Sequence, residues 1–403
     1  MSYISEAADI YKHNYSTEQV TPIIERDHTF YAMTTKKKGG SGADYSYYIP
    51  IANPQAVGNV FATVQTAAQN SGTLTGEQAT TQPVLKYAIA DLDGPSMLRA
   101  GDRKGAFFDL LTGHTDAQLE EFGNRKAFDF YRSGTGMRGR RASASTNAIT
   151  LTVADDVRNF APKQTIIADD TITGASPRSG STTVVAVDED SGTITLASAA
   201  AISLFADNDY LFQAGEGGVG SCVDGLALFV PTTAPVYGSD LFRGHDRGQD
   251  VRRLAGCRTV DTGSYWEEVI GLTAVKCQNN HFRPNVAFAN PLKVFEMAKR
   301  ENAKIMYKPG KTAEVYFQYI VLNTPAGALE VMADPDCPTT HAYIGNMEYW
   351  EELYLGDSYI HPINDAGYQY GIQAAADGIE ARFRCLAQTI MRRPGHFGVA
   401  QGS

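Results

Sequence analysis

Two glycine-rich runs in the chain have the spacing of a dinucleotide-binding loop. Gly134 to Gly139 and Gly215 to Gly220 both have the pattern Gly-x-Gly-x-x-Gly. Such a loop needs a strand before it and a helix after it, so that the pyrophosphate meets the amino terminus of the helix. Here the first run follows helical sequence and opens a β-rich segment, and the second leads into the apolar run Leu226 to Val230. We therefore expect no nucleotide site and no cofactor.

Two acidic segments contain residue types that bind metals. The start of a calcium loop is imitated by Asp188 to Gly192, but the Glu expected six residues after the Gly is missing, and the same residues are a strong hairpin signal. His341 lies near Asp334 and Asp336 and could in principle ligate a metal. The proline spacing around these aspartates more simply describes a rigid turn. We expect a hairpin, a turn and no metal.

Other sequence motifs of catalytic sites are absent or weak. The sequence has no Gly-x-Ser-x-Gly elbow and no His-Glu-x-x-His pair, and its eight histidines lie far apart. Arg138, Arg140 and Arg141 could touch phosphate, but three arginines on a loop more often form a solvated or salt-bridged face. The sequence therefore does not support an enzyme.

Composition points to a folded protein that stays in the compartment where it is made. The 35 basic and 45 acidic residues give a formal charge of −10, which argues against a dedicated nucleic-acid binder. The chain has no long apolar run, and its first residues are polar, so we expect synthesis in a cytoplasm and no membrane. The cysteines are scattered and odd in number, which predicts buried thiols in a reducing compartment: Cys222, Cys257, Cys277, Cys337 and Cys385.

The most unusual segment is nearly free of charge. Between Lys38 and Lys86 only Asp44 and Glu77 are charged. Extended sequence without charges leaves sheet edges unprotected in water. We therefore expect an arm of two extended runs that lies on another protein chain, because a two-stranded ribbon is marginal by itself. A flexible polar loop is the alternative.

The two runs of this arm differ in pattern. In the first, apolar residues alternate with Ser46, Tyr48 and Pro50, which gives a strand with one apolar face: Tyr45, Tyr47, Ile49 and Ile51. The second run is Gln82 to Leu92, after a polar bend around Asn70 to Gly76.

The next two segments have contrasting periodicity. Arg103 to Tyr131 has apolar residues at helical spacing and no proline, which predicts one long helix. From Asn147 to Gln213 short apolar runs alternate with turn residues, which predicts a small closed or sandwiched β-domain inserted into the main fold.

The last part, Gly215 to Ser403, is mixed. Ser264 and Glu267 have the spacing of a capping box. The residues that follow at helical steps predict a buried helix face: Trp266, Val269, Ile270, Thr273, Ala274 and Cys277. A strand at 286–288 leads to a second helix with Asn290 as its cap. Further strands are predicted at 315–322, 328–332, 342–344 and 379–385, giving an α+β fold.

The order of these parts resembles the major capsid proteins of tailed bacteriophages with the Hong Kong 97 fold. The long helix ends in Ser133-Gly134-Thr135-Gly136, the β-insertion follows, and Gly225-Leu226 leads to a helix-strand-helix unit. The matching sequence motifs are short. Residues 184–188 and 193–196, with Asp209-Tyr210-Leu211, resemble the inserted β-domain of the family, and Arg283-Pro284-Asn285 to Asn290-Pro291 resembles the link between its two later helices. Residues 328–331, 334–338 and 342–344 resemble the strand, turn and strand near its carboxyl end. The resemblance covers almost the whole chain, and its specificity comes from the order of the motifs.

The resemblance implies a domain plan. It comprises an amino-terminal arm at 1–45, an extended loop at 46–90, a peripheral domain at 91–141 with a spine helix at 103–131, the inserted β-domain at 142–214, a peripheral part at 215–284, an axial domain at 285–375, and a return to the peripheral domain at 376–403. It also implies a structural shell protein that encloses double-stranded DNA, with a related nanocompartment shell or tail protein as the alternative.

The resemblance further implies partners and contact residues. The expected partners are copies of the chain in hexamers and pentamers, a scaffolding protein, a portal, possible decoration proteins and packaged DNA, with assembly in a bacterial host cytoplasm and residence in the virion. The arm is expected to contact a neighbouring subunit through Tyr45, Tyr47, Ile49, Ile51, Val60, Phe61, Val84 and Leu85. Some family members form a Lys to Asn isopeptide bond on this arm. Since 39–85 contains no Lys, non-covalent contacts or a cementing partner are expected here.

Overall fold

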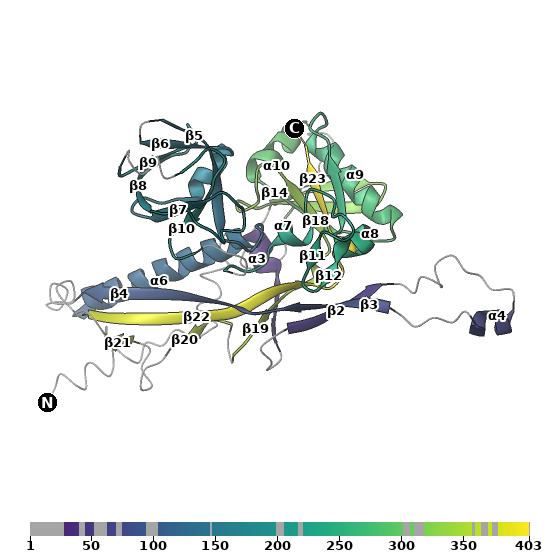
Figure 1. Cartoon of the computed structure of the whole chain (residues 1–403), viewed down its shortest axis with the longest axis horizontal. Helices are drawn as coiled ribbons and strands as arrows, with labels where there is room; N and C mark the ends of the chain where they lie inside the picture. Colours follow the sequence, from purple (N-terminus) through teal and green to yellow (C-terminus); the bar gives the residue numbers. More distant parts are fainter. Residues whose placement is uncertain are drawn as a thin grey trace. The chain divides into compact units, whose positions relative to one another are not determined.

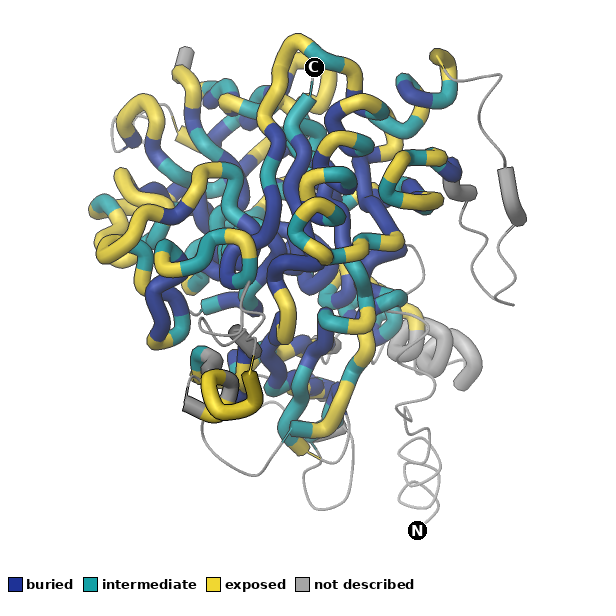
Figure 2. The backbone as a smooth tube through the Cα atoms, turned by 90° about the vertical axis from the view of Figure 1, so that its right-hand side faces the viewer, coloured by how far each residue is buried: buried dark blue, intermediate teal, exposed yellow. Residues whose placement is uncertain are grey.

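The computed structural model forms two compact units. Unit 1 comprises Met1–Lys38, Val84–Leu228 and Tyr354–Gln388, and unit 2 comprises Gly39–Pro83, Phe229–Leu353 and Thr389–Ser403. The structure describes residues 28–39, 45–51, 63–69, 75–93, 104–145, 147–198, 205–216, 221–300, 307–309, 318–356, 359–363, 370–372 and 378–402. The buried residues of these ranges are coloured dark blue in Figure 2.

A long helix organises unit 1. Helix α6 (Lys104–Asp129) has 26 residues and is about 39 Å long at 1.5 Å per residue, which confirms the helix predicted at 103–131. It lies along β4 (Val84–Asp93), which pairs antiparallel with β22 (Gly378–Met391) (Figure 1). Helix α3 (Thr29–Met33) packs its buried Phe30 and Tyr31 rings against Phe130, just after the end of α6. Residues 29–33 of the predicted amino-terminal arm are therefore packed into unit 1.

The predicted β-insertion is a closed six-stranded barrel in unit 1, in the order β10-β5-β6-β9-β8-β7. Its strands are β5 (Met137–Ser145), β6 (Ala148–Leu151), β7 (Thr165–Asp169), β8 (Thr182–Asp188), β9 (Thr193–Leu196) and β10 (Tyr210–Gln213). Alternate apolar side chains fill its interior, including Ile149, Ile166, Val184 and Ile194. Strand β5 departs from the prediction, because Arg138, Arg140 and Arg141 lie on this strand and not on a loop.

Unit 2 is built on a seven-stranded mixed sheet in the order β13-β23-β18-β14-β17-β16-β15. The strands are β13 (Cys257–Val260), β14 (Val286–Ala289), β15 (Tyr307–Pro309), β16 (Gln318–Thr324), β17 (Gly327–Ala333), β18 (Ala342–Gly345) and β23 (Gly398–Gln401). Helices α9 (Trp266–Asn279) and α10 (Pro291–Arg300) pack on this sheet and share its apolar core. Mixed helix and strand content confirms the α+β fold.

Helix α9 tests the sequence pattern closely. All six residues predicted for its buried face are buried. Its predicted cap is wrong, because Tyr265 is the N-cap residue and makes no side-chain cap bond, while the Ser264 hydroxyl donates to Asp261 at 2.8 Å. For α10 the prediction is confirmed, since the Asn290 side chain accepts a hydrogen bond from the Leu292 N–H at 3.0 Å.

The uncharged arm contains a hairpin of unit 2. Strand β2 (Tyr45–Ile51) pairs with β3 (Thr75–Thr81), from Tyr45 opposite Thr81 to Ile51 opposite Thr75. In Figure 1 the hairpin projects from unit 2, with α4 (Val64–Gln69) beyond its far end. The predicted return run at 82–92 is wrong as a partner for β2. Pro83 lacks an N–H for the ladder, and the chain after it belongs to β4 of unit 1.

The remaining elements are short. They are β1 (Thr35–Lys38), the 3-10 helix η1 (Ala154–Asn159), α7 (Leu226–Phe229), β11 (Leu241–Phe242), β12 (His245–Asp246), η3 (Arg247–Gln249), α8 (Val251–Leu254), η4 (Met347–Tyr349), β19 (Trp350–Tyr354), β20 (His361–Pro362), β21 (Tyr370–Ile372) and η5 (Pro394–His396). One boundary between the two units lies between Leu228 and Phe229, and another lies between Gln388 and Thr389.

Two general expectations concern the whole chain. All five cysteines are buried free thiols, as the sequence predicts. Among the described helices, none is long and apolar enough to cross a membrane.

Candidate functional site

The residues predicted to contact a neighbour fall into three groups. On β2, Tyr45, Tyr47 and Ile49 are buried, with 4%, 5% and 2% of their surfaces exposed. On β4, Val84 is buried and Leu85 is 44% exposed. The Ile51 side chain, Val60 and Phe61 lie outside what the structure describes.

The apolar face of the hairpin packs on its own chain. Tyr47, Ile49 and Ala79 form one cluster with Leu254 and Ile390, all within unit 2. The alternation seen in the sequence is therefore right, but a part of the same chain covers this face in the structure. The opposite face is exposed and uncharged: Ser46, Tyr48, Gln78 and Thr80. A neighbour that contacts this part of the hairpin would meet that polar face.

Arg243 fastens the base of the hairpin. Its guanidinium donates to the Tyr47 hydroxyl and to the Thr389 carbonyl oxygen, both at 2.9 Å. Its own carbonyl oxygen accepts the Thr80 N–H at 3.1 Å. Arg243 and Gly244 both have positive φ (50° and 92°), as a two-residue turn between β11 and β12 requires. The sequence analysis did not predict this turn, although Gly244 at its second position is a residue that such turns favour.

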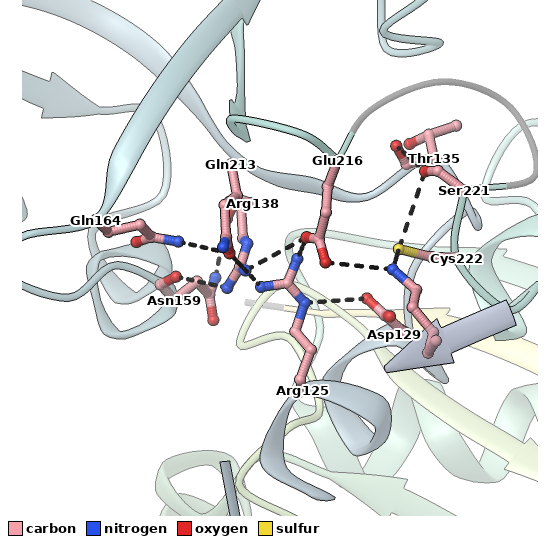
Figure 3. A network of polar contacts seen from close by, with 11 residues as sticks. Arg125, Asp129, Thr135, Arg138, Asn159, Gln164, Gln213, Glu216, Ser221 and Cys222 are labelled. Atoms are coloured by element: carbon pink, nitrogen blue, oxygen red, sulfur yellow. Dashed lines mark hydrogen bonds and ion pairs between the residues drawn. The ribbon is translucent and has the colours of Figure 1, made fainter. Parts of the chain in front are cut away.

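A second site joins the barrel to the long helix in unit 1 (Figure 3). The Glu216 carboxylate, just after β10, binds Arg125 of α6 and accepts from Lys86 Nζ of β4 at 3.3 Å. It also lies 3.5 Å from Arg138 Nη2 of β5. Glu216 is thus the shared anion for cations from three elements. Such ion pairs are screened less than fully exposed ones, because their side chains are only 7% to 23% exposed.

Neutral groups complete this junction. The Gln213 amide oxygen accepts from Arg125, from Arg138 and from Gln164 Nε2, the last at 3.1 Å. Lys86 also donates to Cys222 Sγ at 3.2 Å. Burial, with Asp129 nearby, raises the pKa of Cys222 to about 12, so the thiol is neutral at pH 7. Charge-assisted hydrogen bonds therefore hold the junction together, and its role is structural.

The sequence motifs that resemble catalytic sites have structural roles. Gly134 and Gly136 have φ of 74° and 80° in the turn that leaves α6, and a Cβ at Gly134 would lie 2.6 Å from an Asp224 oxygen. The predicted hairpin is confirmed: Asp188 Oδ1 accepts the N–H groups of Asp190 and Ser191 between β8 and β9.

The turn predicted at 334–338 is also confirmed, because Asp334 accepts the Asp336 N–H at 3.0 Å. Within the described ranges, no three His, Cys, Asp or Glu side chains gather as metal ligands would.

Comparison with known proteins gives a fold and no sequence family. No protein family model matches the chain, and no curated protein matches it. A capsid chain of cyanophage A-1(L) matches at a TM-score of 0.54 and 10% identity, over 97% of this chain and 94% of that one.

Two other solved structures match less well. A chain of Mycobacterium phage Ogopogo gives a TM-score of 0.46 at 9% identity, over 94% and 93% of the two chains. The SrpI encapsulin of Synechococcus elongatus PCC 7942 gives 0.45 at 7%, over 98% and 94%. On the cyanophage match, which spans nearly the full length of both proteins, the chain has the α+β fold of a phage capsid subunit.

Proposed function

We propose that the chain is a structural major capsid protein that assembles into the icosahedral head of a tailed double-stranded DNA bacteriophage. The observation that carries this function is the capsid fold over 97% of the chain. A projecting hairpin with an uncharged, exposed face supports it, because a segment that lies on a neighbouring subunit needs few charges.

Assembly would work through many modest contacts. Copies in hexamers and pentamers would each lay the arm at 46–90 on a neighbour, and a stable contact needs roughly 1,000 Å² of buried surface. The contacts would be non-covalent, because the arm lacks a Lys from Gly39 to Leu85. The domain plan inferred above, including an axial domain at 285–375, is part of the same proposal.

Other partners follow from this role. A scaffolding protein and a portal would act during assembly in the host cytoplasm, and the virion would hold DNA by non-specific contact. A decoration or cement protein is a further candidate partner of the finished shell. The alternative function is a related shell or tail structural protein, such as an encapsulating nanocompartment. Electron microscopy separates them, since a nanocompartment is small and has no portal.

The direct test removes the far end of the arm and keeps its base. Because Ile51 pairs with Thr75, replacing residues 52–74 by Asn-Gly closes β2 and β3 with a two-residue turn and leaves the buried cluster intact. We expect a folded chain whose yield of shells falls at least tenfold, measured by negative-stain microscopy and sedimentation.

A matched control changes an exposed part of the barrel. Val185→Ser on β8, 55% exposed, should leave shell yield unchanged. Normal shells from the shortened arm would contradict an assembly role for it.

A further inference from the structure

One loop of unit 2 displays large apolar side chains to solvent. In residues 231–241, here called the display loop, Val236, Tyr237 and Leu241 are 66%, 73% and 78% exposed. Single exposed apolar residues are ordinary, but three within six residues form a patch of the kind that marks a contact site.

Hydrogen bonds to the buried Asp246 and Arg247 tie this loop to the residues that follow it. Asp246 accepts the Gly238 N–H at 2.6 Å through one oxygen and the Gly248 N–H at 2.8 Å through the other. Asp240 Oδ1 accepts two bonds from the buried Arg247, at 2.7 and 3.1 Å. A loop that is ordered before binding loses less conformational entropy on association.

The close fit of the loop adds to its order. A Cβ at Gly248 would lie 2.3 Å from the Tyr237 nitrogen, so the loop backbone rests directly on the bare Gly248 backbone. The three apolar side chains are therefore presented outward from a fixed support, as interface anchors are.

Unit 1 carries a second apolar patch with a different form. On β4, Leu85, Tyr87 and Ile89 are 44%, 54% and 47% exposed, while the alternating Ala88 and Ala90 are buried. Successive side chains of a strand point to opposite faces, so the three exposed residues form one stripe on the sheet. We call this the β4 stripe.

Each patch also has a polar group at its edge. Arg384 of β22 stands opposite Tyr87 in the β4 stripe, is exposed, and has no ion-pair partner among the described residues. In the display loop, Asp240 uses only Oδ1 to bind Arg247, and its side chain is 27% exposed. Beside its three apolar side chains, the β4 stripe thus offers the Arg384 guanidinium, and the display loop offers the Asp240 oxygen that Arg247 leaves unused.

We propose that the display loop of one copy docks on the β4 stripe of the next copy. Two different patches on one chain give a head-to-tail contact that repeats around a ring or shell. The contact rests on the proposed capsid function and adds to it a second interface besides the arm. Its core is Tyr237 and Leu241 against Tyr87 and Ile89, with Asp240 facing Arg384.

A mixing experiment tests this pairing. Tyr87→Cys and Tyr237→Cys are made as separate full-length chains, since both sites are exposed and the native cysteines are all buried. Each chain alone, and a mixture of the two, is assembled and treated with a short bismaleimide. We expect covalent dimers in the mixed shells at least tenfold above those in either single-variant shell. A mixture of Val185→Cys and Tyr237→Cys is the control and should give no dimers.

The outcomes separate the interface from the function. Shells without mixed dimers overturn the interface and leave the capsid function standing. Dimers from Tyr237→Cys alone show loop-to-loop contact and also overturn it. If the unsubstituted chain also stays monomeric, the capsid function and the interface are overturned together. In a second measurement, Leu241→Ser should raise the protein concentration needed for half-assembly about tenfold or more, and an unchanged concentration would count against the interface.

Discussion

The hairpin base and the barrel junction are held by opposite kinds of interaction. At the hairpin base, Tyr47, Ile49 and Ala79 are buried in an apolar cluster, and the Arg243 guanidinium donates to the Tyr47 hydroxyl. At the barrel junction, the Glu216 carboxylate forms ion pairs with Lys86, Arg125 and Arg138. Salt screens the attraction between paired charges, whereas apolar burial involves no charge that salt could screen. The arm and the barrel should therefore loosen under different conditions.

The largest expected effect is at the hairpin base. Ile49→Ala should lower the free energy of unfolding by about 3 kcal/mol, because it leaves a cavity in a buried cluster. Tyr48→Ala, on the opposite face of the same strand, should cost less than about 1 kcal/mol. Urea denaturation measures both. Equal costs would mean that the face identified as buried is not the one that stabilises the hairpin.

The barrel junction should respond less and should depend on salt. Glu216→Gln leaves three cations without their shared carboxylate, at a cost of about 2 kcal/mol for this partly buried site. The cost should shrink in 1 M NaCl. Glu189→Gln, on the exposed β8–β9 turn, is the matched control and should have no effect. A salt-independent loss at Glu216 would show that packing and not charge holds the barrel.

The smallest effect concerns the pH dependence of stability that His245 of β12 produces. Burial, with Arg247 and Arg243 nearby, lowers the pKa of His245 despite Asp240 and Asp246, and neither ring nitrogen has a hydrogen-bond partner among the described residues. The unfolded chain then binds a proton that the folded chain does not. Stability is therefore full above the unfolded pKa of about 6.5 and falls as the pH drops through it.

Thermal melts at pH 7.5 and 5.5 measure this dependence. His245→Phe, which keeps an aromatic ring against Phe242, should reduce the loss of stability at pH 5.5. Part of the loss should remain, because burial also lowers the pKa of His396. An undiminished loss in the variant would assign the whole effect to other groups.

Local periodicity predicted much of the fold. The buried face of α9 and the long helix α6 were readable because their apolar spacing spans several turns. The alternating apolar residues of its strands predicted the barrel, except for β5. Arg138 and Arg141 of β5 are buried and form ion pairs, and the spacing of apolar residues in the sequence cannot reveal such pairs. Strand β3 was missed because its sequence, Thr75–Thr81, is polar.

The candidate sites were harder to predict. Alternation in β2 showed that one face is apolar, but not which surface covers it, because that depends on Leu254 and Ile390, distant in sequence. Glu216 gave no signal either. Its three partners come from 78 to 130 residues away, so only the folded chain brings them together.

The size of the particle formed by the purified full-length chain tests the capsid function most directly. Sedimentation velocity with negative-stain microscopy should show closed shells containing many copies. A well-ordered monomer at concentrations suited to assembly would contradict the capsid function.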